Sequence, residues 1–477
     1  MNNLPVPGSH VHLIAICGVG MAALAGLLKS LGYRVTGSDT TAYPPMSTYL
    51  DRLGIPIQQG YHRSHLEQRP DLVVVGNAVS RDNPEVQVVL DKGVPSISFP
   101  QALGMFLIGS KKAIVVAGTH GKTSTTSLLA WVLNQAKLDP SFFVGGLPVN
   151  FDSGFKVGGG PWVVLEGDEY DSAFFDKGPK FLHYKPEKVI LTSLEFDHAD
   201  IYTDLEHMKS AFERLVEMVP SSGTLLVSNQ YEAAKEVVRG ASCPVIYYGQ
   251  GEPTGWVARD VRVERGRVRF EPIYKGTSDG TVAISLFGRH NVDNALGVYA
   301  MARELGLKPN IIRKAMTTFA GVRRRQEIKG EVGGVTLIDD FAHHPTAVRE
   351  TIAGVKMSYP GRRLWAIFEP RSQTSRRRIF ESEFAEALAE ADRVVVAGLY
   401  QPEKIPEKER LSPEAVVTEI GRLCGDGRAV TIEKADQIAT HVTQQSQSGD
   451  IILVMSNGGF DKVQHKILNL LKVRRLP

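Results

Sequence analysis

A glycine-rich turn over residues 117–124 carries the residue types of a nucleotide-phosphate site. It lies between an apolar run that predicts a strand, 113–116, and a run from near residue 125 that predicts a helix. Backbone N–H groups of such a turn point at phosphates, Lys122 would reach the β- and γ-phosphates of ATP, and the hydroxyl of Thr123 could bind Mg²⁺. Val116 stands where the general pattern has glycine, so a plain strand-to-helix connection remains an alternative. The residues assigned to ATP in this turn are Gly118, Thr119, His120, Gly121, Lys122, Thr123 and Ser124.

A second glycine turn, with Gly18 and Gly20, lies close to the N-terminus. The run 10–17 predicts the strand before it, and the next predicted strand, 33–37, leads to Asp39. In Rossmann-like units the glycines let the backbone approach a diphosphate, and an acidic residue about 20 positions later holds a ribose. The turn fits NAD or any other nucleotide diphosphate, including a UDP-sugar. A tight connection that binds no ligand is the third interpretation.

Acidic residues and a histidine follow two further predicted strands. Glu166 ends the strand 162–166, and His198 comes shortly after the strand 189–194. Since ligands of open α/β sheets gather at the carboxyl ends of strands, we expect both side chains to converge on Lys122 and Thr123. A carboxylate and an imidazole beside a phosphate turn favour a divalent metal site, although histidine is an unusual ligand for magnesium. The alternative is that the acids cap helices and that His198 packs against a loop.

The elements that must position these side chains are Val- and Ile-rich runs that alternate with longer helical patterns. This alternation predicts parallel α/β units, and 477 residues are too many for one core. We predict an α/β fold with a Rossmann-like N-terminal domain (1–109), a central phosphate-loop ATPase-like domain (110–322) and a Rossmann-like C-terminal domain (323–477). Short alternating strands over 245–287 predict a small antiparallel appendage on the central domain. Strand candidates of the third domain are 335–339, 364–368, 393–397 and 451–455.

Composition excludes several classes of protein. With 43% hydrophobic and 22% charged residues the chain is typical of globular proteins, and a net charge of +3 gives no reason to expect nucleic acid as a partner. Three widely spaced cysteines indicate neither a disulfide framework nor a zinc cluster. No apolar run approaches the ~18 residues that span a bilayer, and no signal sequence is apparent. We therefore expect a cytoplasmic protein without membrane partners, and the oligomeric state is left open.

Several segments, taken together and in this order, resemble the Mur ligase family, the ATP-dependent amide ligases of peptidoglycan metabolism. They are the turn at 118–123, Glu166-Gly167-Asp168-Glu169, Phe196-Asp197-His198, the run 288–295 and the run 339–345. The resemblance covers nearly the whole chain. The family's own phosphate turn also lacks the first glycine, so Val116 agrees with it.

Finer features are similar to one branch of that family. The run 17–21 and His343-His344-Pro345 resemble the branch whose acceptor is UDP-N-acetylmuramate. Within it, the runs 43–47, 149–151, 173–177 and 182–186 resemble the member that joins L-alanyl-γ-D-glutamyl-meso-diaminopimelate to this acceptor in peptidoglycan recycling. The run 368–372 looks unlike the relative that adds free L-alanine in peptidoglycan biosynthesis. That L-alanine ligase remains the alternative.

The resemblance also implies cofactors and roles. The lactyl carboxylate would attack ATP to form an acyl phosphate, which the amine of the peptide then attacks, with ATP and Mg²⁺ required. The catalytic residues would be Lys122, Glu166, His198 and His343, and the metal ligands Thr123, Glu166 and His198. Further ATP contacts would be His290, Asn291, Asn294, Arg324, Arg325 and Asp339. The UDP-sugar would contact Gly18, Gly20, Met21, Ser38, Asp39 and Asn77.

The peptide site has no local motif in the sequence. Arg371 is a candidate because a guanidinium group matches a carboxylate, and Ser372 and Asn457 are weaker candidates.

Other interpretations remain open for parts of the site. For His290, Asn291 and Asn294, the alternative to an adenine contact is a capped helix start. An NAD-dependent oxidoreductase would leave the phosphate turn unexplained, and a non-catalytic nucleotide-binding regulator would not need Lys122, Glu166 and His198 together.

Overall fold

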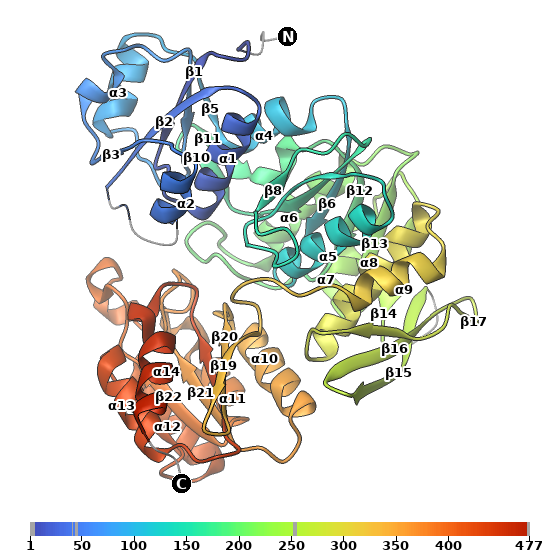
Figure 1. Cartoon of the computed structure of the whole chain (residues 1–477), viewed down its shortest axis with the longest axis vertical. Coiled ribbons are helices and arrows are strands. Elements are labelled where there is room, and N and C mark those ends of the chain that lie inside the picture. The colour runs from blue at the N-terminus through green and yellow to red at the C-terminus, as the bar shows by residue number, and fades with distance from the viewer. Residues whose placement is uncertain (1–4, 41, 43–45, 251–254, 475–477) are drawn as a thin grey trace.

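Three α/β units, each built around its own sheet, follow one another along the chain (Figure 1). The computed structural model describes residues 5–40, 42, 46–250 and 255–474, so residues 43–45 of the 43–47 run lie outside the described part. The N-terminal unit is blue in Figure 1, the central unit runs from cyan to yellow, and the C-terminal unit is orange and red. The predicted α/β class with three domains is confirmed. The boundaries at 109/110 and 322/323 stay a prediction.

The N-terminal unit is a parallel sheet of Rossmann type with the strand order β3-β2-β1-β4-β5. Its strands are β1 (His10–Ile14), β2 (Arg34–Asp39), β3 (Ile57–Gln59), β4 (Leu72–Val75) and β5 (Ser96–Ser98). Its helices are α1 (Val19–Ser30), α2 (Met46–Arg52), α3 (Pro84–Asp91) and α4 (Phe99–Leu103). Strand β1 ends earlier than the sequence predicts, because the chain turns at Ala15, whose φ is 68°. The backbone N–H groups of Ala15 and Ile16 both donate to the carbonyl of Ser38, which fixes this turn against β2.

The central unit holds the largest sheet, ordered β17-β16-β15-β14-β13-β12-β6-β9-β7-β8, with β18 paired to β16. Its strands are β6 (Lys112–Ala117), β7 (Ser141–Phe143), β8 (Phe155–Lys156), β9 (Trp162–Gly167), β12 (Pro186–Leu191), β13 (Thr224–Ser228), β14 (Val245–Gly249), β15 (Trp256–Glu264), β16 (Arg267–Tyr274), β17 (Thr277–Ser278) and β18 (Val282–Ile284). Its helices are α5 (Lys122–Gln135), α6 (Leu205–Glu217), α7 (Glu232–Val237), α8 (Arg289–Glu304) and α9 (Pro309–Thr317).

The predicted antiparallel appendage is present, and its strands belong to the same sheet as the parallel strands. Strand β14 pairs parallel with both β13 and β15, and only from β15 onward do the strands pair antiparallel with β16. The appendage therefore extends the edge of the parallel sheet.

A short hairpin of β10 (Asp171–Ala173) and β11 (Asp176–Pro179) reaches from the central unit to the N-terminal unit. The hydroxyl of Ser98 donates to the carboxylate of Asp176 over 2.6 Å, and Phe174 packs against the core of the N-terminal unit. The hairpin therefore joins the first two units.

The C-terminal unit has the strand order β19-β20-β24-β21-β22-β23, parallel except for β19 at one edge. Its strands are β19 (Glu327–Val332), β20 (Val335–Asp340), β21 (Leu364–Phe368), β22 (Arg393–Ala397), β23 (Ala429–Ile432) and β24 (Ile451–Met455). Its helices are α10 (Pro345–Ser358), α11 (Glu381–Ala389), α12 (Pro413–Cys424), α13 (Ala435–Gln445) and α14 (Val463–Val473). The four predicted strands are present, and the sequence prediction missed β19 and β23, whose residues are only partly buried.

The strand registers decide which loops become neighbours. Ala117 of β6 pairs with Gly167 of β9 on one side and with Leu191 of β12 on the other. The phosphate turn after β6 therefore lies between the loops that follow β9 and β12. In the C-terminal sheet, Met455 pairs with both Asp340 and Phe368, so the loops after β20, β21 and β24 also share one edge.

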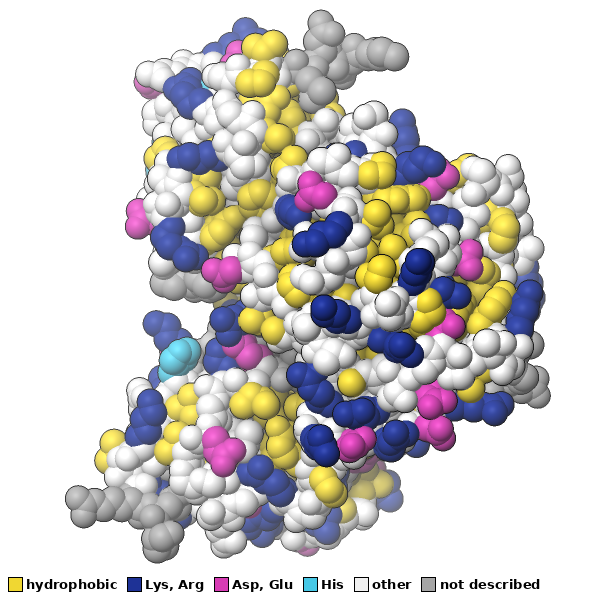
Figure 2. Space-filling view, turned by 45° about the vertical axis from the view of Figure 1, so that its right-hand side comes forward, with side chains coloured by type: hydrophobic (Ala, Val, Ile, Leu, Met, Phe, Trp, Pro, Cys, Tyr) yellow, Lys and Arg dark blue, Asp and Glu magenta, His cyan; other side chains and the backbone are white. Residues whose placement is uncertain are grey.

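Two further features concern the surface. Figure 2 shows a notch between the N-terminal and C-terminal units, with basic and acidic side chains at its edge. Across the described residues, none of the helices combines the length and the apolar character needed to cross a membrane.

The core of the central unit supplies a stability test. Phe212 of α6 is fully buried, and its ring centroid lies 5.3 Å from that of Phe181. We expect Phe212→Ala to cost about 3–5 kcal/mol of folding free energy through the cavity it leaves. Thermal unfolding should show a midpoint lowered by about 5 °C or more. The matched control is Glu213→Ala at the next, exposed position, and a Phe212→Ala midpoint equal to that of the control would contradict this packing.

Candidate active site

The phosphate turn is held rigidly against the end of β12. Gly118 has a φ of 135°, and a Cβ there would lie 2.4 Å from Oγ1 of Thr192, so only glycine fits. Gly121, with a φ of 80°, precedes α5, which begins at Lys122 rather than near residue 125 as the sequence predicts. The backbone N–H of His120 donates to the hydroxyl of Ser193 over 2.8 Å. The first turn of α5 therefore opens toward the loops after β9 and β12, as an anion site requires.

Lys122 is paired with a buried carboxylate. Its Nζ lies 3.0 and 2.8 Å from the two oxygens of Glu169 and donates over 2.6 Å to the carbonyl of Gly118. Burial disfavours the charge on Lys122, but Glu169 and Asp168 outweigh it and raise the pKa of the ammonium above its usual value. The sequence prediction did not include Glu169 among the site residues, although the acidic run after β9 could have indicated it. Glu169 is therefore the closest charged partner of Lys122.

Glu166 lies beside Thr123 on the other side of the turn. The hydroxyl of Thr123 donates to Oε1 of Glu166 over 2.6 Å, and the N–H of Gly145 donates to Oε2 over 2.7 Å. Burial, together with Asp168, raises the pKa of Glu166. A hydroxyl and a carboxylate are hard oxygen ligands, so this pair fits Mg²⁺.

His198 reaches the same network from the loop after β12. Its Nε2 lies 3.2 Å from Oε1 of Glu169, and its φ of 53° is unusual for a residue other than glycine. Burial opposes protonation, but Glu169 and Asp197 outweigh it and raise the pKa of His198 to about 9. An imidazolium cannot bind a cation, so His198 fits a metal ion only after it loses its proton.

The structure thus brings Lys122, Thr123, Glu166 and His198 to one edge of the sheet, as the sequence predicts.

The two adjacent histidines after β20, His343 and His344, differ in their surroundings. Nδ1 of His343 lies 3.0 Å from the carbonyl of Phe341, so this nitrogen carries the proton and donates. Burial lowers the pKa of His343 to about 4, and the ring is neutral near pH 7.

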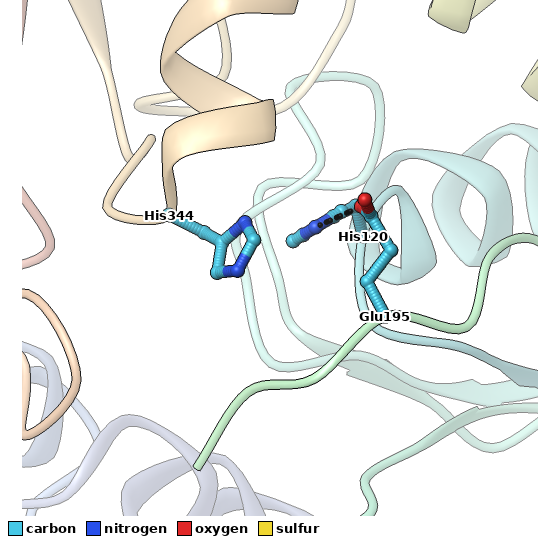
Figure 3. Close-up of side chains that lie close together, drawn as sticks. All are labelled: His120, Glu195 and His344. Atoms are coloured by element: carbon cyan, nitrogen blue, oxygen red, sulfur yellow. Dashed lines mark ion pairs between the residues drawn. The ribbon is translucent and has the colours of Figure 1, made fainter. Parts of the chain in front are cut away.

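His344 instead has a structural role at the start of α10. Its Nδ1 accepts from the N–H of Thr346 over 3.3 Å, and its Nε2 then donates to the carbonyl of Phe196 over 3.2 Å. Figure 3 shows its ring facing that of His120, whose Nε2 lies 3.0 Å from Oε2 of Glu195. Both nitrogens of His344 are engaged, so the three side chains form a polar contact between the central and C-terminal units.

The two arginines predicted to contact ATP lie in different surroundings. Nη2 of Arg325 donates to Oγ1 of Thr123 over 3.2 Å, and its guanidinium lies 4.7 Å from the ring centroid of Phe341, so it reaches the phosphate turn. Arg324 remains within the C-terminal unit, where it donates to the carbonyls of Ser456 and Gly458. Its Nε also lies 3.6 Å from the carboxylate of Asp339, which accepts from Gln464 over 2.8 Å. Arg324 and Asp339 thus bind each other at the edge of that sheet.

The candidates for adenine lie at the start of α8, where Asn291 and Asn294 are buried. The amide of Asn291 is buried and donates to the carbonyl of Phe287 and to Gln326, so it is not presented to a base. Asn294 packs directly against Gly121, where a Cβ would lie 2.6 Å from its oxygen. His290 is partly exposed, with Nδ1 3.3 Å from Glu350. Of these three, His290 is the side chain open to a nucleotide.

The N-terminal glycine turn also requires one correction. The hydroxyl of Ser38 is buried and donates over 2.5 Å to Glu85, so its side chain does not face a ligand. Asp39 accepts from the backbone N–H of Cys17 over 2.8 Å, which fixes the turn before α1. Gly18, directly before α1, and Asn77, after β4, are exposed. Gly20, in the first turn of α1, is half-buried, and Met21 is buried in the same helix.

The three peptide candidates lie on adjacent loops of the C-terminal sheet. The guanidinium of Arg371 lies 3.6 Å from the ring centroid of Tyr400 and packs against Gly458. Oδ1 of Asn457 is buried and has no hydrogen-bond partner within the described ranges. The hydroxyl of Ser372 bonds that of Ser375 within its own loop, so Arg371 and Asn457 are better placed for a ligand.

Comparisons with known proteins agree with this arrangement. Residues 10–111 match the model of the Mur ligase family catalytic domain, 116–302 that of the Mur ligase middle domain, and 324–458 that of the Mur ligase glutamate ligase domain.

Individual relatives match over almost their full length. The chain is 41% identical to the UDP-N-acetylmuramate–L-alanyl-γ-D-glutamyl-meso-2,6-diaminoheptandioate ligase of Escherichia coli (strain K12), over 96% of this chain and 97% of that protein. It is 33% identical to the UDP-N-acetylmuramate–L-alanine ligase of Variovorax paradoxus (strain S110), over 98% and 96%. The crystal structure of a murein peptide ligase from Psychrobacter arcticus 273-4 matches with a TM-score of 0.74 and 35% identity, over 98% of this chain and 100% of that one. The chain therefore belongs to the Mur ligase family of ATP-dependent ligases.

Proposed function

We propose that this chain joins UDP-N-acetylmuramate to the tripeptide L-alanyl-γ-D-glutamyl-meso-diaminopimelate, with ATP, in peptidoglycan recycling. The observation that carries the choice of donor is the identity of 41% to a tripeptide ligase against 33% to an L-alanine ligase, over similar shares of the chain. Addition of free L-alanine is the second candidate, because the phosphate turn and the acidic residues around it suit either amine.

The reaction needs activation of a carboxylate, because its carbonyl is poorly electrophilic and an oxide ion is a poor leaving group. In the proposed sequence the lactyl carboxylate attacks the γ-phosphorus of ATP, which gives an acyl phosphate and ADP. The amine of the tripeptide then attacks the acyl carbon, the amide forms and phosphate leaves. Protein groups contribute to such a transfer through positioning and charge neutralisation.

The residues of the turn supply that neutralisation. We assign Lys122 and the backbone N–H groups of the turn to the β- and γ-phosphates, with Lys122 exchanging Glu169 for phosphate oxygens when ATP binds. Arg325, which already contacts Thr123, would reach the same phosphates from the C-terminal unit. When bound, Mg²⁺ neutralises the charge of the transferring phosphoryl group. Thr123 and Glu166 would hold a first ion, and His198, once it has lost its proton, would hold a second.

His343 is assigned to the reacting groups from the side of the C-terminal unit. Its ring is neutral, and because Nδ1 donates to Phe341, Nε2 keeps a lone pair that can accept a hydrogen bond. The carboxylates of the tripeptide are assigned to Arg371, with Asn457 as a further contact of the peptide on the same edge of the C-terminal unit, and the UDP-sugar to the glycine turn of the N-terminal unit. We place the reaction in the cytoplasm.

The donor is tested by ATP-dependent phosphate release from the purified protein with Mg²⁺ and UDP-N-acetylmuramate. We expect release with the tripeptide and much less with free L-alanine at equal concentration. Mass spectrometry of the nucleotide product confirms which amide formed. Phosphate release with L-alanine but not with the tripeptide would contradict the proposal and indicate the biosynthetic reaction instead.

Lys122 is tested by Lys122→Ala, with Lys112→Ala as the matched control. Lys112 is exposed at the opposite end of β6, so its loss should leave turnover unchanged. Loss of Lys122 should lower the rate at least about 10²–10³-fold, because an aimed electrostatic contact to the reacting phosphate is removed. Circular dichroism should show both variants folded. Wild-type turnover by Lys122→Ala would rule out the assigned phosphate site.

A further inference from the structure

Three consecutive residues of the central unit each accept a hydrogen bond from the C-terminal unit. Oγ1 of Thr346 donates to Glu195 over 3.1 Å, and Nε2 of His344 donates to the carbonyl of Phe196 over 3.2 Å. Oγ1 of Thr374 donates to Oδ1 of Asp197 over 2.7 Å. The C-terminal unit thus holds this segment, residues 195–197, by both side chains and backbone.

The segment leads directly into His198. Oδ1 of Asp197, the atom that accepts from Thr374, also accepts from the backbone N–H of His198 over 2.7 Å. His198 then adopts the left-handed conformation, with a φ of 53°, and its carbonyl accepts from the N–H groups of Ile201 and Tyr202. A non-glycine residue in that conformation is strained and persists only where its surroundings hold it. The contact at Asp197 is part of what holds it.

Thr374 itself belongs to the segment of the C-terminal unit assigned to the peptide. It lies two and three residues after Ser372 and Arg371, in a turn closed by hydrogen bonds between Ser372 and Ser375. Thr374 and Asp197 are each 3% exposed, so this bond is shielded from solvent. One buried hydrogen bond therefore connects the peptide-side turn to the segment that carries His198.

We propose that Thr374 is a positioning residue of the ligase, acting through Asp197 to set the orientation of His198. Docking of the C-terminal unit then sets both the position of the peptide-side turn and the orientation of the His198 imidazole beside the phosphate site. The kinetic consequence rests on the proposed function. The positioning itself does not, because it concerns the conformation of residues 197–202 in the protein without ligands.

The test compares Thr374→Val, which removes the hydroxyl at nearly constant volume, with Thr374→Ser, which keeps it. The control is Thr443→Val, at a buried threonine of the same unit whose hydroxyl has no hydrogen-bond partner among the described residues. Thr374→Ala repeats the loss of the hydroxyl in case the valine packs poorly. Amide hydrogen exchange of the protein without nucleotide or metal is read at residues 198, 201 and 202. In a second measurement, turnover is titrated with Mg²⁺.

We expect Thr374→Val and Thr374→Ala to speed exchange at these amides about 10-fold or more, as loss of a hydrogen bond to a charged group implies. The Mg²⁺ concentration for half-maximal turnover should rise several-fold, while Thr374→Ser and Thr443→Val resemble the wild type. Wild-type exchange in both Thr374 variants, or equally fast exchange in Thr443→Val, would overturn the proposal. Failure of the wild type to use the tripeptide would instead count against the proposed function and leave the exchange result standing.

Discussion

The ion pair between Lys122 and Glu169 is the interaction on which the rest of the site depends. Glu169 is almost completely buried, and a buried carboxylate is tolerated only when cations and hydrogen bonds compensate it. Here Lys122 and the imidazolium of His198 both provide that compensation. Any ligand that withdraws Lys122 from Glu169 must therefore bring its own charge balance. Phosphates with a divalent cation meet that requirement.

The geometry of that pair follows from the sheets. Parallel strands place their carboxyl ends at one edge, and the register of β6 between β9 and β12 puts the phosphate turn next to both acidic loops. The C-terminal sheet gathers the loops after β20, β21 and β24 in the same way. The two edges meet at Arg325, His344 and Thr374, so residues far apart in the chain share one environment.

Local patterns were sufficient to predict much of this from the sequence. The convergence of Lys122, Thr123, Glu166 and His198 could be predicted because strand ends and glycine turns are local signals. The buried orientations of Ser38 and Asn291 could not, because they depend on which neighbour, Glu85 or Gln326, the fold places opposite them. Glu169 was missed because several acids follow β9 and only the structure shows which one faces Lys122. The bond between Thr374 and Asp197 joins residues 177 positions apart, a distance at which no local pattern carries information.

Transfer of an oxygen atom is the most direct test of carboxylate activation at this site. UDP-N-acetylmuramate labelled with ¹⁸O in its lactyl carboxylate would be turned over with ATP, Mg²⁺ and the tripeptide, and the released phosphate analysed by mass spectrometry. If the carboxylate attacks the γ-phosphorus, one ¹⁸O atom from the labelled carboxylate appears in each phosphate, and the amide keeps the other. Phosphate free of ¹⁸O, formed alongside ligated product, would contradict the acyl-phosphate route.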